Sequence, residues 1–328
     1  MAEVARLAGV SSTTVSHVLN QTRRVSPETE ELVLQAVART GYRNNLAARA
    51  LAIQSTDTVG VAMSVVTNPY FGELVRDIER VLRHAGYTMI VADTNDDPVV
   101  EVDVIDHLLA RRVSGLIVSP LEGNAELTEG MSKLLDDGFP LLFLDRRSTL
   151  PGDQVYSECV DSIYHLTAHL AAQGHRRIGF INDIEPIPAT LGRLRGYQEA
   201  LAAHGIAFDP NLVAAGPSDS HGGYDTTLAL FQQPDRPTAL FCFNDRMAMG
   251  AYDALRKLKL SIPQAVAVIG FDNQEIIAAA LHPGLSTMQL PHYQMGQWAI
   301  NYLFAEALEG KPAVHAVLEC PYIERESV

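Results

Sequence analysis

The apolar positions of the first nineteen residues, MAEVARLAGVSSTTVSHVL, predict two short helices joined by a turn. Gly9 permits the positive φ that a tight turn between helices requires. Ser11 is a good N-cap for the second helix. Apolar side chains fall where two crossing helices would press together, at Val4, Ala5, Ala8, Val10, Val15, Val18 and Leu19.

A third short helix is expected directly after this pair. Ser26-Pro27-Glu28 places a capping Ser before Pro at the first helical position and an acid in the first turn, and Gly41 ends the segment. Three short helices within residues 1–41 are typical of a compact DNA-reading headpiece. A helical hairpin that serves only for packing has the same pattern and remains the alternative. The apolar stripe of the third helix is expected at Leu32, Ala36 and Val37.

From residue 57 onward, continuous apolar runs alternate with amphipathic helical patterns. Such an alternation predicts parallel sheets with helices on both faces. Seven runs exceed one comfortable sheet, so we expect two similar lobes. The strands are expected at 58–66, 87–95, 115–121, 140–147, 176–183, 238–245 and 267–273.

Polar residues gather at the carboxyl ends of these predicted strands. In open α/β sheets this edge forms the ligand crevice, and two facing lobes would make a cleft of carboxylates and amides. Such groups suit the hydroxyls of a sugar, and Tyr70-Phe71 could stack on a sugar face. Each polar residue alone could instead begin a turn or cap a helix. The set comprises Asp93, Asp145, Asp183, Asn244, Asp245 and Asp272.

The charge of the chain is unevenly distributed. Its 328 residues carry a net charge of −14, but residues 1–56 hold six Arg and four Glu, a net of +2. The remaining residues therefore hold −16. We expect modest, salt-sensitive DNA affinity, with dimerisation doubling the number of phosphate contacts.

Neither a membrane span nor a secretory leader is visible in the sequence. No run of 18 apolar residues occurs, and the N-terminus lacks an apolar signal-peptide core. We expect a cytoplasmic protein that needs no cofactor. Its three cysteines lack metal-ligand spacing and are expected to be buried or idle thiols: Cys159, Cys242 and Cys320.

The motifs of common α/β enzymes are missing from the body. There is no GxSxG, GxxxxGK[ST], HExxH, or GxGxxG after the first strand. His165 and His169 share a helix face, but no carboxylate or Cys is spaced to complete a metal site, so we interpret them as a surface pair. We therefore expect no catalytic residue and no enzyme.

The headpiece sequence resembles a known family. VARLAGVSSTTVSHVLNQTRRVSPETEELVLQA, followed by GYRNNLAARALA, resembles the DNA-binding domain and hinge of the lactose-repressor/galactose-repressor (LacI/GalR) family, and the resemblance extends across essentially the whole chain. It implies a helix-turn-helix headpiece followed by a two-lobed, periplasmic-binding-protein-like α/β effector domain with three crossovers. The implied boundaries are 1–44 for the headpiece, 45–56 for the hinge helix and linker, and 57–328 for the effector-binding and dimerisation domain, with one lobe at 57–157 and 290–317 and the other at 158–289 and 318–328.

Two features depart from the family pattern. The family has several more residues before its first helix, so Met1 falls where an internal apolar residue usually lies. We expect either that the natural start lies further upstream or that the first helix frays. Asn44 stands where the family tends to have Pro, which predicts a looser entry to the hinge.

The resemblance also implies a set of DNA contacts. Within the second helix Ser12, Thr13 and His17 match base-reading positions, and Ser16 lies on the same polar face. The segment 45–52 is too short to be a stable isolated helix in water and matches the hinge that inserts a Leu into the minor groove. An ordinary Ala-rich linker is the alternative. The remaining implied contacts are Ser11, Asn20 and Arg23 to phosphates, and Asn45, Ala48, Arg49 and Leu51 in the hinge.

An effector pocket is implied in the body. Ile187 stands where purine-sensing members carry a second Arg, Ser218 where an aromatic is frequent, and Leu290 where Gln is common. A pocket without the second Arg suits an anion poorly, so we expect a neutral carbohydrate or related polyol. The pocket residues are expected to be Tyr70, Phe71, Asp145, Arg193, Asn244 and Asp272, joined by Ser64 and Ser119.

Several functional questions stay open at this point. The expected function is repression from a palindromic double-stranded DNA operator by a homodimer. The chain ends at ERESV with no heptad tail beyond the last strand, so we expect a dimer and not a dimer of dimers. The sequence is compatible with an inducer or a co-repressor as the ligand, and with activation as well as repression of transcription. A solute-binding protein of the two-lobed type is the main competitor, which the headpiece argues against, and an α/β enzyme with a helical leader is the third.

Overall fold

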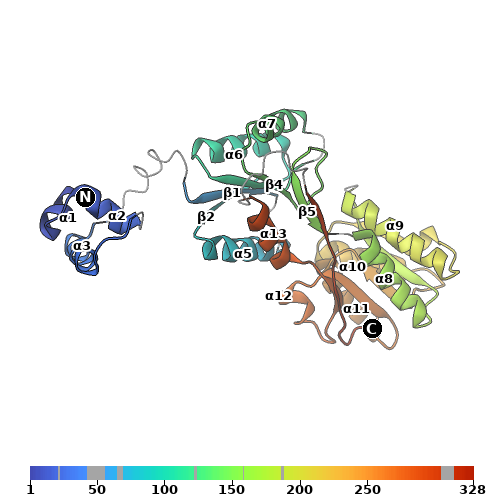
Figure 1. The fold of residues 1–328 in the computed structure, drawn as a ribbon. Helices are drawn as coiled ribbons and strands as arrows, with labels where there is room; N and C mark the ends of the chain where they lie inside the picture. Colours follow the sequence, from blue (N-terminus) through green and yellow to red (C-terminus); the bar gives the residue numbers. More distant parts are fainter. Residues whose placement is uncertain are drawn as a thin grey trace. The chain divides into compact units, whose positions relative to one another are not determined.

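The protein forms two compact units in a computed structural model, Met1–Thr56 and Asp57–Val328 (Figure 1). The predicted hinge residues Asn45, Ala48, Arg49 and Leu51, and the neighbouring Asn44, lie outside the described residues. The structure describes residues 1–20, 23–42, 56–64, 69–121, 124–157, 159–185, 188–303 and 314–328.

The first unit contains the three predicted helices, α1 (Ala2–Ala8), α2 (Ser12–Asn20) and α3 (Pro27–Thr40). Gly9 and Gly41 end α1 and α3 with φ of 66° and 61°, which confirms the turns expected there. The Ser26 hydroxyl accepts the backbone N–H of Thr29 at 3.2 Å and caps α3. The buried core of this unit consists of Val4, Ala5, Ala8, Val15, Val18, Val33 and Ala36.

The predicted stripe of α3 is wrong at one position. Leu32 is 45% exposed, whereas Val33 is fully buried. Val33, Ala36 and Val37 are spaced i, i+3, i+4 and form one narrow stripe, while Leu32 lies about 100° around the helix from Val33 and faces solvent.

The second unit is built on two six-stranded sheets, which confirms the predicted two-lobed α/β fold. The first sheet is parallel and has the strand order β11-β5-β4-β3-β1-β2. Its strands are β1 (Thr58–Met63), β2 (Thr88–Asp93), β3 (Gly115–Val118), β4 (Leu141–Leu144), β5 (Asp153–Ser157) and β11 (His315–Leu318).

The second sheet repeats this order as β12-β10-β9-β8-β6-β7. Among the strand pairings described in this sheet, β12 with β10 is antiparallel and the others are parallel. The strands are β6 (Ile178–Asp183), β7 (Val213–Gly216), β8 (Ala239–Cys242), β9 (Ala267–Asp272), β10 (Ser286–Gln289) and β12 (Tyr322–Ile323). All seven expected strands are present, and each is shorter than its predicted range. Five further strands were not predicted: β5, β7, β10, β11 and β12.

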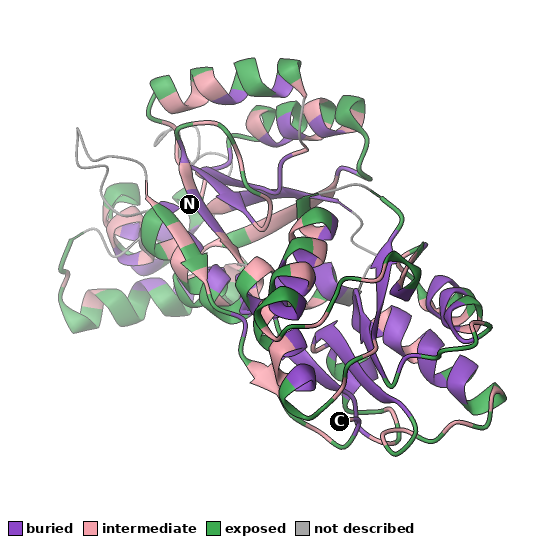
Figure 2. Cartoon of the chain, turned by 90° about the vertical axis from the view of Figure 1, so that its right-hand side faces the viewer, coloured by how far each residue is buried: buried purple, intermediate pink, exposed green. Residues whose placement is uncertain are grey.

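Helices cover both faces of each sheet, and the strands are mostly buried between them (Figure 2). Helices α5 and α13 pack on one face of the first sheet and α6 and α7 on the other; α8 and α9 face α10 and α11 across the second sheet. The helices are α5 (Pro69–His84), α6 (Pro98–Ala110), α7 (Ala125–Asp136), α8 (Cys159–Ala172), α9 (Pro188–Ala203), α10 (Ser220–Leu230), α11 (Asp245–Lys257), α12 (Glu275–Ala278) and α13 (His292–Leu303), with a 3-10 turn at Pro210–Leu212.

The chain passes between the two sheets at three places, after β5, after β10 and after β11. Among the described residues, no helix is both long and apolar enough to cross a membrane. Cys242 is a buried free thiol and Cys320 is also buried, as expected, and the side chain of Cys159 lies outside the description.

Candidate functional site

The second helix of the headpiece presents an uncharged polar face. Ser12 and Thr13 are exposed, and Ser16 and His17 are half-buried, while Val15 and Val18 point into the core. Hydroxyl and imidazole groups on one helix face can donate to and accept from base edges. The structure therefore brings the four predicted base-side residues together on α2.

The predicted phosphate contacts are placed differently. Ser11 caps α2, because its hydroxyl accepts the backbone N–H of Thr14 at 3.1 Å. Arg23 is exposed after α2, and the side chain of Asn20 lies outside the description. Exposed Arg and a capping Ser at a helix start are groups that bind DNA phosphates.

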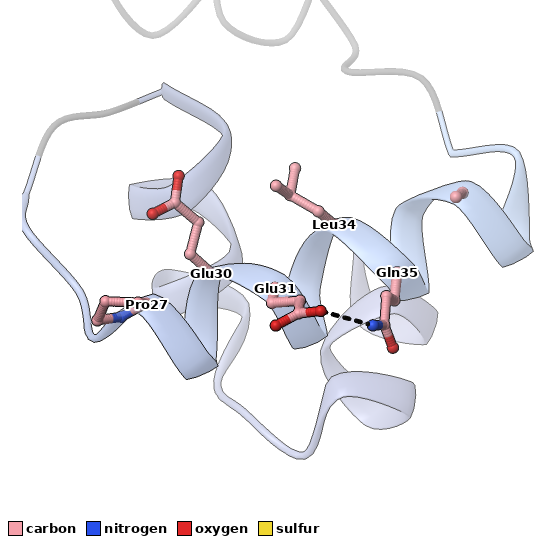
Figure 3. A pocket seen from close by; sticks show the side chains of 6 residues that line it. Pro27, Glu30, Glu31, Leu34 and Gln35 are labelled. Atoms are coloured by element: carbon pink, nitrogen blue, oxygen red, sulfur yellow. Dashed lines mark hydrogen bonds between the residues drawn. The ribbon is translucent and has the colours of Figure 1, made fainter.

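The outer side of α3 has a different character. A surface groove there is lined by Pro27, Glu30, Glu31, Leu34, Gln35 and Ala38 (Figure 3). The amide of Gln35 donates to Glu31 at 3.3 Å, and Leu34 is 51% exposed. Because its charged side chains are Glu30 and Glu31, this groove disfavours phosphate groups.

In the body, Tyr70 and Asp145 meet at the carboxyl end of the first sheet. The Tyr70 hydroxyl donates to an Asp145 carboxylate oxygen, and Phe71 packs edge-on against Tyr70 with ring centroids 4.7 Å apart. Burial raises the pKa of the Asp145 carboxyl, and the hydrogen bond from Tyr70 opposes this rise. The three predicted residues from the first lobe thus form one group, in which Tyr70 and Phe71 are buried and Asp145 is half-buried.

Arg193 supplies the corresponding group from the second lobe. Its guanidinium lies between two aromatic rings, 3.8 Å from the centroid of Phe271 and 4.1 Å from that of Phe243. It donates to the carbonyl oxygen of Phe243 and pairs with Asp272 at 3.9 Å, while its Nε has no hydrogen-bond partner. Because a guanidinium has five donors, Arg193 retains N–H groups for a ligand oxygen.

Asp272 adopts a strained backbone conformation beside this arginine. Its φ is 110°, and that of the next residue, Asn273, is 55°. Burial raises the pKa of Asp272 to about 6, opposed by Arg193. Asp145, which also has a positive φ of 69°, lies close enough to interact electrostatically with both Arg193 and Asp272. Strained, charged residues from both lobes converging on one point are typical of a ligand site.

Of the other predicted pocket residues, Asn244 and Ser64 form hydrogen bonds within the fold, and Ser119 does not. Asn244 caps α11, since its Oδ1 accepts the N–H of Met247 at 2.8 Å. Its Nδ2 donates to the backbone carbonyl oxygen of Ser218 at 3.2 Å. Ser64 accepts from Arg146 at 2.9 Å. Ser119 is buried, and its hydroxyl has no hydrogen-bond partner.

A buried carboxylate, that of Asp245, holds the turn at Asp272 in place through hydrogen bonds. Asp245 accepts from the Thr287 hydroxyl and from the Gln274 N–H, each at 2.7 Å, and Gln274 in turn donates to Asp272 at 2.9 Å. Burial, followed by repulsion from Asp272, raises the pKa of Asp245. Asp245 therefore fixes the turn that presents Asp272.

His292 and Glu73 lie where the two lobes meet. The ring of His292 packs edge-on against Tyr70 with centroids 5.0 Å apart, and its Nδ1 lies 3.9 Å from Glu73. Glu73, on α5, accepts the backbone N–H of Glu275 in the second lobe at 3.1 Å. Burial raises the pKa of Glu73.

We expect His292→Gln to gain stability relative to the wild type as the pH falls from 7 to 5. Burial, helped by Arg76, lowers the pKa of His292 from 6.5 to about 4, so folding favours its neutral form. Its contribution is complete above pH 6.5 and is lost as the pH falls toward 4, by on the order of 3 kcal/mol. Urea unfolding of both proteins at several pH values measures the difference.

The pH dependence of the variant must be compared with that of the wild type, because Asp272 changes the stability of both proteins with pH in the direction opposite to His292. Its raised pKa gives a contribution that is present at low pH and lost as the pH rises through about 6. Both proteins keep Asp272, so its effect cancels. A stability difference that stays constant over this pH range contradicts the prediction.

Four important residues were missed from the sequence: Phe243, Phe271, Glu73 and His292. The two phenylalanines had a usable signal, since each directly precedes a polar residue at a strand end, in Phe243-Asn244 and Phe271-Asp272. Glu73 and His292 had none, because their meeting depends on how the lobes close. In the part of the chain that the structure describes, no His, Cys, Asp and Glu cluster could hold a metal ion.

His165 and His169 take the positions expected of a helix-surface pair. His165 is exposed, and His169 is half-buried, with its ring 5.2 Å from that of Tyr322 and its Nε2 3.2 Å from the Gln173 amide.

Two family descriptions match the chain. "Bacterial regulatory proteins, lacI family" matches residues 1–45, and "Periplasmic binding protein-like domain" matches residues 167–328. Two curated relatives span nearly the whole chain. The transcriptional repressor PurR of Photobacterium profundum is 33% identical over 92% of this chain and 90% of its own, and the ribose operon repressor of Haemophilus influenzae is 33% identical over 100% and 98%.

Solved structures show the same architecture. The lac repressor bound to ONPG in its repressed state superimposes with a TM-score of 0.86 at 27% identity, covering 99% of this chain and 98% of that one. The complex of the transcriptional regulator CelR with cellobiose has a TM-score of 0.71 at 27% identity, with coverage of 99% and 98%.

Proposed function

The chain belongs to the lacI family of bacterial regulatory proteins, and we propose that it represses transcription from a palindromic operator as a homodimer controlled by a neutral carbohydrate. Its relatives are transcriptional repressors, which are not enzymes, so the enzyme alternative is excluded. Because a repressor acts on DNA, we place this one in the cytoplasm. The observation that carries the proposal is the pairing of a polar reading helix with a two-lobed carboxylate and arginine site.

The proposed DNA contacts follow the chemistry of the headpiece. Ser12, Thr13, Ser16 and His17 on α2 read base edges, and Ser11, Asn20 and Arg23 contact phosphates. The hinge contacts at Asn45, Ala48, Arg49 and Leu51 rest on the resemblance alone. With a net charge of only +2 over residues 1–56, a single headpiece binds weakly, so occupancy depends on two headpieces acting together.

The effector class is argued from the buried charges. Asp145 in the first lobe and Asp272 in the second offer hydrogen-bond acceptors, and Arg193 in the second lobe offers donors. Vicinal hydroxyls of a sugar can both donate to and accept from such groups. Arg193 faces the carboxylates of Asp145 and Asp272, and Arg146 and Arg246 also lie near these two acids. Residue 187 is Ile where purine-sensing members of the family carry a second Arg, so the site lacks that partner for an anion. PurR and the ribose operon repressor are equally identical to this chain, so these identities do not choose the effector. The Ile at position 187 favours a neutral carbohydrate, and the CelR regulator was solved with cellobiose.

Effector binding would act through the relative position of the lobes. A ligand held by Asp145 on one side and by Arg193 with Asp272 on the other stabilises the closed arrangement. We propose that this closure shifts the hinges between DNA-competent and incompetent states. A ligand that favours the competent state is a co-repressor, and one that disfavours it is an inducer.

The function is tested by fluorescence anisotropy on palindromic DNA drawn from the neighbourhood of the gene, with and without a panel of neutral sugars. We expect salt-dependent binding to one palindrome and a change in affinity with one sugar. Response only to phosphorylated or carboxylated ligands would exclude the neutral carbohydrate, and sugar binding without any operator would favour a solute-binding role.

His17→Ala is expected to weaken operator binding by about 1–3 kcal/mol and to relax one symmetric pair of base positions. Imidazole is the strongest base-reading group on α2, because Ser and Thr hydroxyls bond to several bases. Anisotropy against operators substituted one position at a time measures both effects. An equal loss on every operator variant would instead identify His17 as a backbone contact.

A further inference from the structure

The last residues of the chain are built into the second lobe. Strand β12 pairs with β10, and a fully buried serine, Ser327, follows four residues after its end. The Ser327 hydroxyl donates to the carbonyl oxygen of Val268 at 2.6 Å and accepts the backbone N–H of Ser286 at 2.8 Å. The backbone is therefore anchored on both sides of the residue that lies between, Arg325.

Arg325 joins this tail to the turn after β9. Its Nη1 donates to the carbonyl oxygen of Leu285 at 2.7 Å, and its Nη2 donates to the side-chain oxygen of Asn273 at 2.7 Å. Its backbone N–H donates to the Ser286 hydroxyl at 2.9 Å. Because a guanidinium presents its donors in a rigid planar fork, these two acceptors fix its orientation.

The turn that Arg325 reaches is strained. Asp272 and Asn273 both have positive φ, 110° and 55°, although neither is a glycine. Asn visits the left-handed conformation more readily than most residues, but strained residues persist only where the surrounding structure enforces them. This conformation decides where the Asp272 carboxylate lies, which is 3.9 Å from Arg193.

Asp245 and Arg325 hold the turn from two different parts of the lobe. Asp245, on α11, accepts the backbone N–H of Gln274 at 2.7 Å, and Arg325, in the tail, donates to Asn273. Arg325 also interacts electrostatically with Asp245. Removal of Arg325 would leave Asp245 to oppose the strain without this partner.

We propose that Arg325 is a positioning residue of the effector site, which holds Asn273 in its left-handed conformation and so keeps the Asp272 carboxylate beside Arg193. The inference rests on the proposed function, in which Asp272 contacts the effector. Because Arg325 acts through Asn273, its loss should loosen the turn even when no sugar is present.

Hydrogen exchange of the full chain without ligand, measured by mass spectrometry on peptides that cover residues 272–275, tests this inference. In Arg325→Met we expect the Gln274 N–H to exchange about tenfold faster than in the wild type, because the turn opens and releases its bond to Asp245. Amides of β8, in the interior of the sheet, should keep their wild-type rates, which separates a local opening from a general loss of stability.

Arg177→Met is the matched control. Arg177 is also half-buried in the second lobe, and its guanidinium donates to the carbonyl oxygen of Asp235 at 2.6 Å and 3.1 Å. It lies directly before the start of β6, whereas the turn follows the end of β9. Its loss should leave exchange at Gln274 unchanged.

Asn273→Gly identifies the contact through which Arg325 acts. Glycine removes the acceptor of the hydrogen bond but adopts a positive φ without strain. In this background Arg325→Met should change Gln274 exchange by less than about twofold, because the bond that it breaks is already absent. An arginine that merely stabilised the tail would have the same effect in both backgrounds.

Unchanged Gln274 exchange in Arg325→Met, equally faster exchange in β8, or the same effect with and without Asn273 overturns the inference. Arg325→Lys keeps the charge and the apolar stem but loses the planar fork, and it replaces Arg325→Met if that variant does not fold.

The neutral sugars of the anisotropy panel are titrated into the same samples by calorimetry. A sugar that binds the wild type should bind Arg325→Met about tenfold more weakly, and undiminished binding also overturns the inference. Failure of every sugar to bind the wild type would count against the proposed function alone, because the exchange measurements need no ligand.

Discussion

Gly250→Ala is expected to prevent stable folding of the second lobe. A Cβ at Gly250, on α11, would overlap the carbonyl oxygen of Ser220 on α10, well inside the 3.0 Å below which real Cβ atoms are not found. Gly223 on α10 is packed as tightly against the carbonyl of Met247. Because backbone cannot rotate away as a side chain can, the two helices must separate. We expect a loss of about 4 kcal/mol or more, a large part of the stability of a domain.

Gly130→Ala is the matched control. Gly130 also lies within a helix, α7, but nothing approaches its Cβ position within 4 Å. Ala should stabilise this helix by about 0.8–1 kcal/mol through propensity alone. Urea unfolding and the yield of soluble protein measure both variants. Equal stability of Gly250→Ala and the wild type would show that α10 and α11 are not in such close contact.

Arg193→Met is expected to abolish effector control while leaving operator binding within about twofold of the wild type. The guanidinium of Arg193 interacts electrostatically with both Asp145 and Asp272 and pairs with Asp272 at 3.9 Å. Each hydrogen bond to a charged group is worth about 1.5–3 kcal/mol. Loss of two such bonds to a sugar would weaken its binding on the order of 100-fold or more.

Arg195→Met controls for the loss of a charge from the same helix. Arg195 is 66% exposed at its side chain and pairs with Glu199 at 3.1 Å, away from the buried group. The shift in operator affinity with the identified sugar is measured for both variants, and thermal melting checks that each is folded. A normal response in Arg193→Met, or an equal defect in Arg195→Met, contradicts the assignment of Arg193.

Much of the fold was readable from the sequence because buried parallel strands are continuous apolar runs. The strands with long runs, such as β1 and β9, were predicted. Those missed are short and lie at or beside a sheet edge, where VAAG in β7 or HAVL in β11 has too few apolar residues to stand out. Leu32 was wrongly assigned to the buried stripe of α3, because the presence of a leucine on a short helix does not show whether its side chain faces the core.

The candidate site was predictable only in part. Asp145 and Asp272 were visible as polar residues that end apolar strands. Their environment was not, because it depends on side chains far apart in the sequence: the ring of Phe243 over Arg193, or His292 against Tyr70. The glycines of α10 and α11 likewise carry no sign of which backbone they approach.

The identical strand orders of the two sheets give the pair of carboxylates Asp145 and Asp272 a simple origin. Counted within each lobe, β4 and β9 are the fourth strands, and each lies between the third and fifth strands of its sheet. Asp145 follows β4 and Asp272 ends β9, both with positive φ. The two carboxylates thus occupy one position used twice, as expected when an ancestral lobe is duplicated and its copies face each other. The two acids are alike in position but differ in their partners, since Asp272 pairs with Arg193 at 3.9 Å and Asp145 accepts from the Tyr70 hydroxyl.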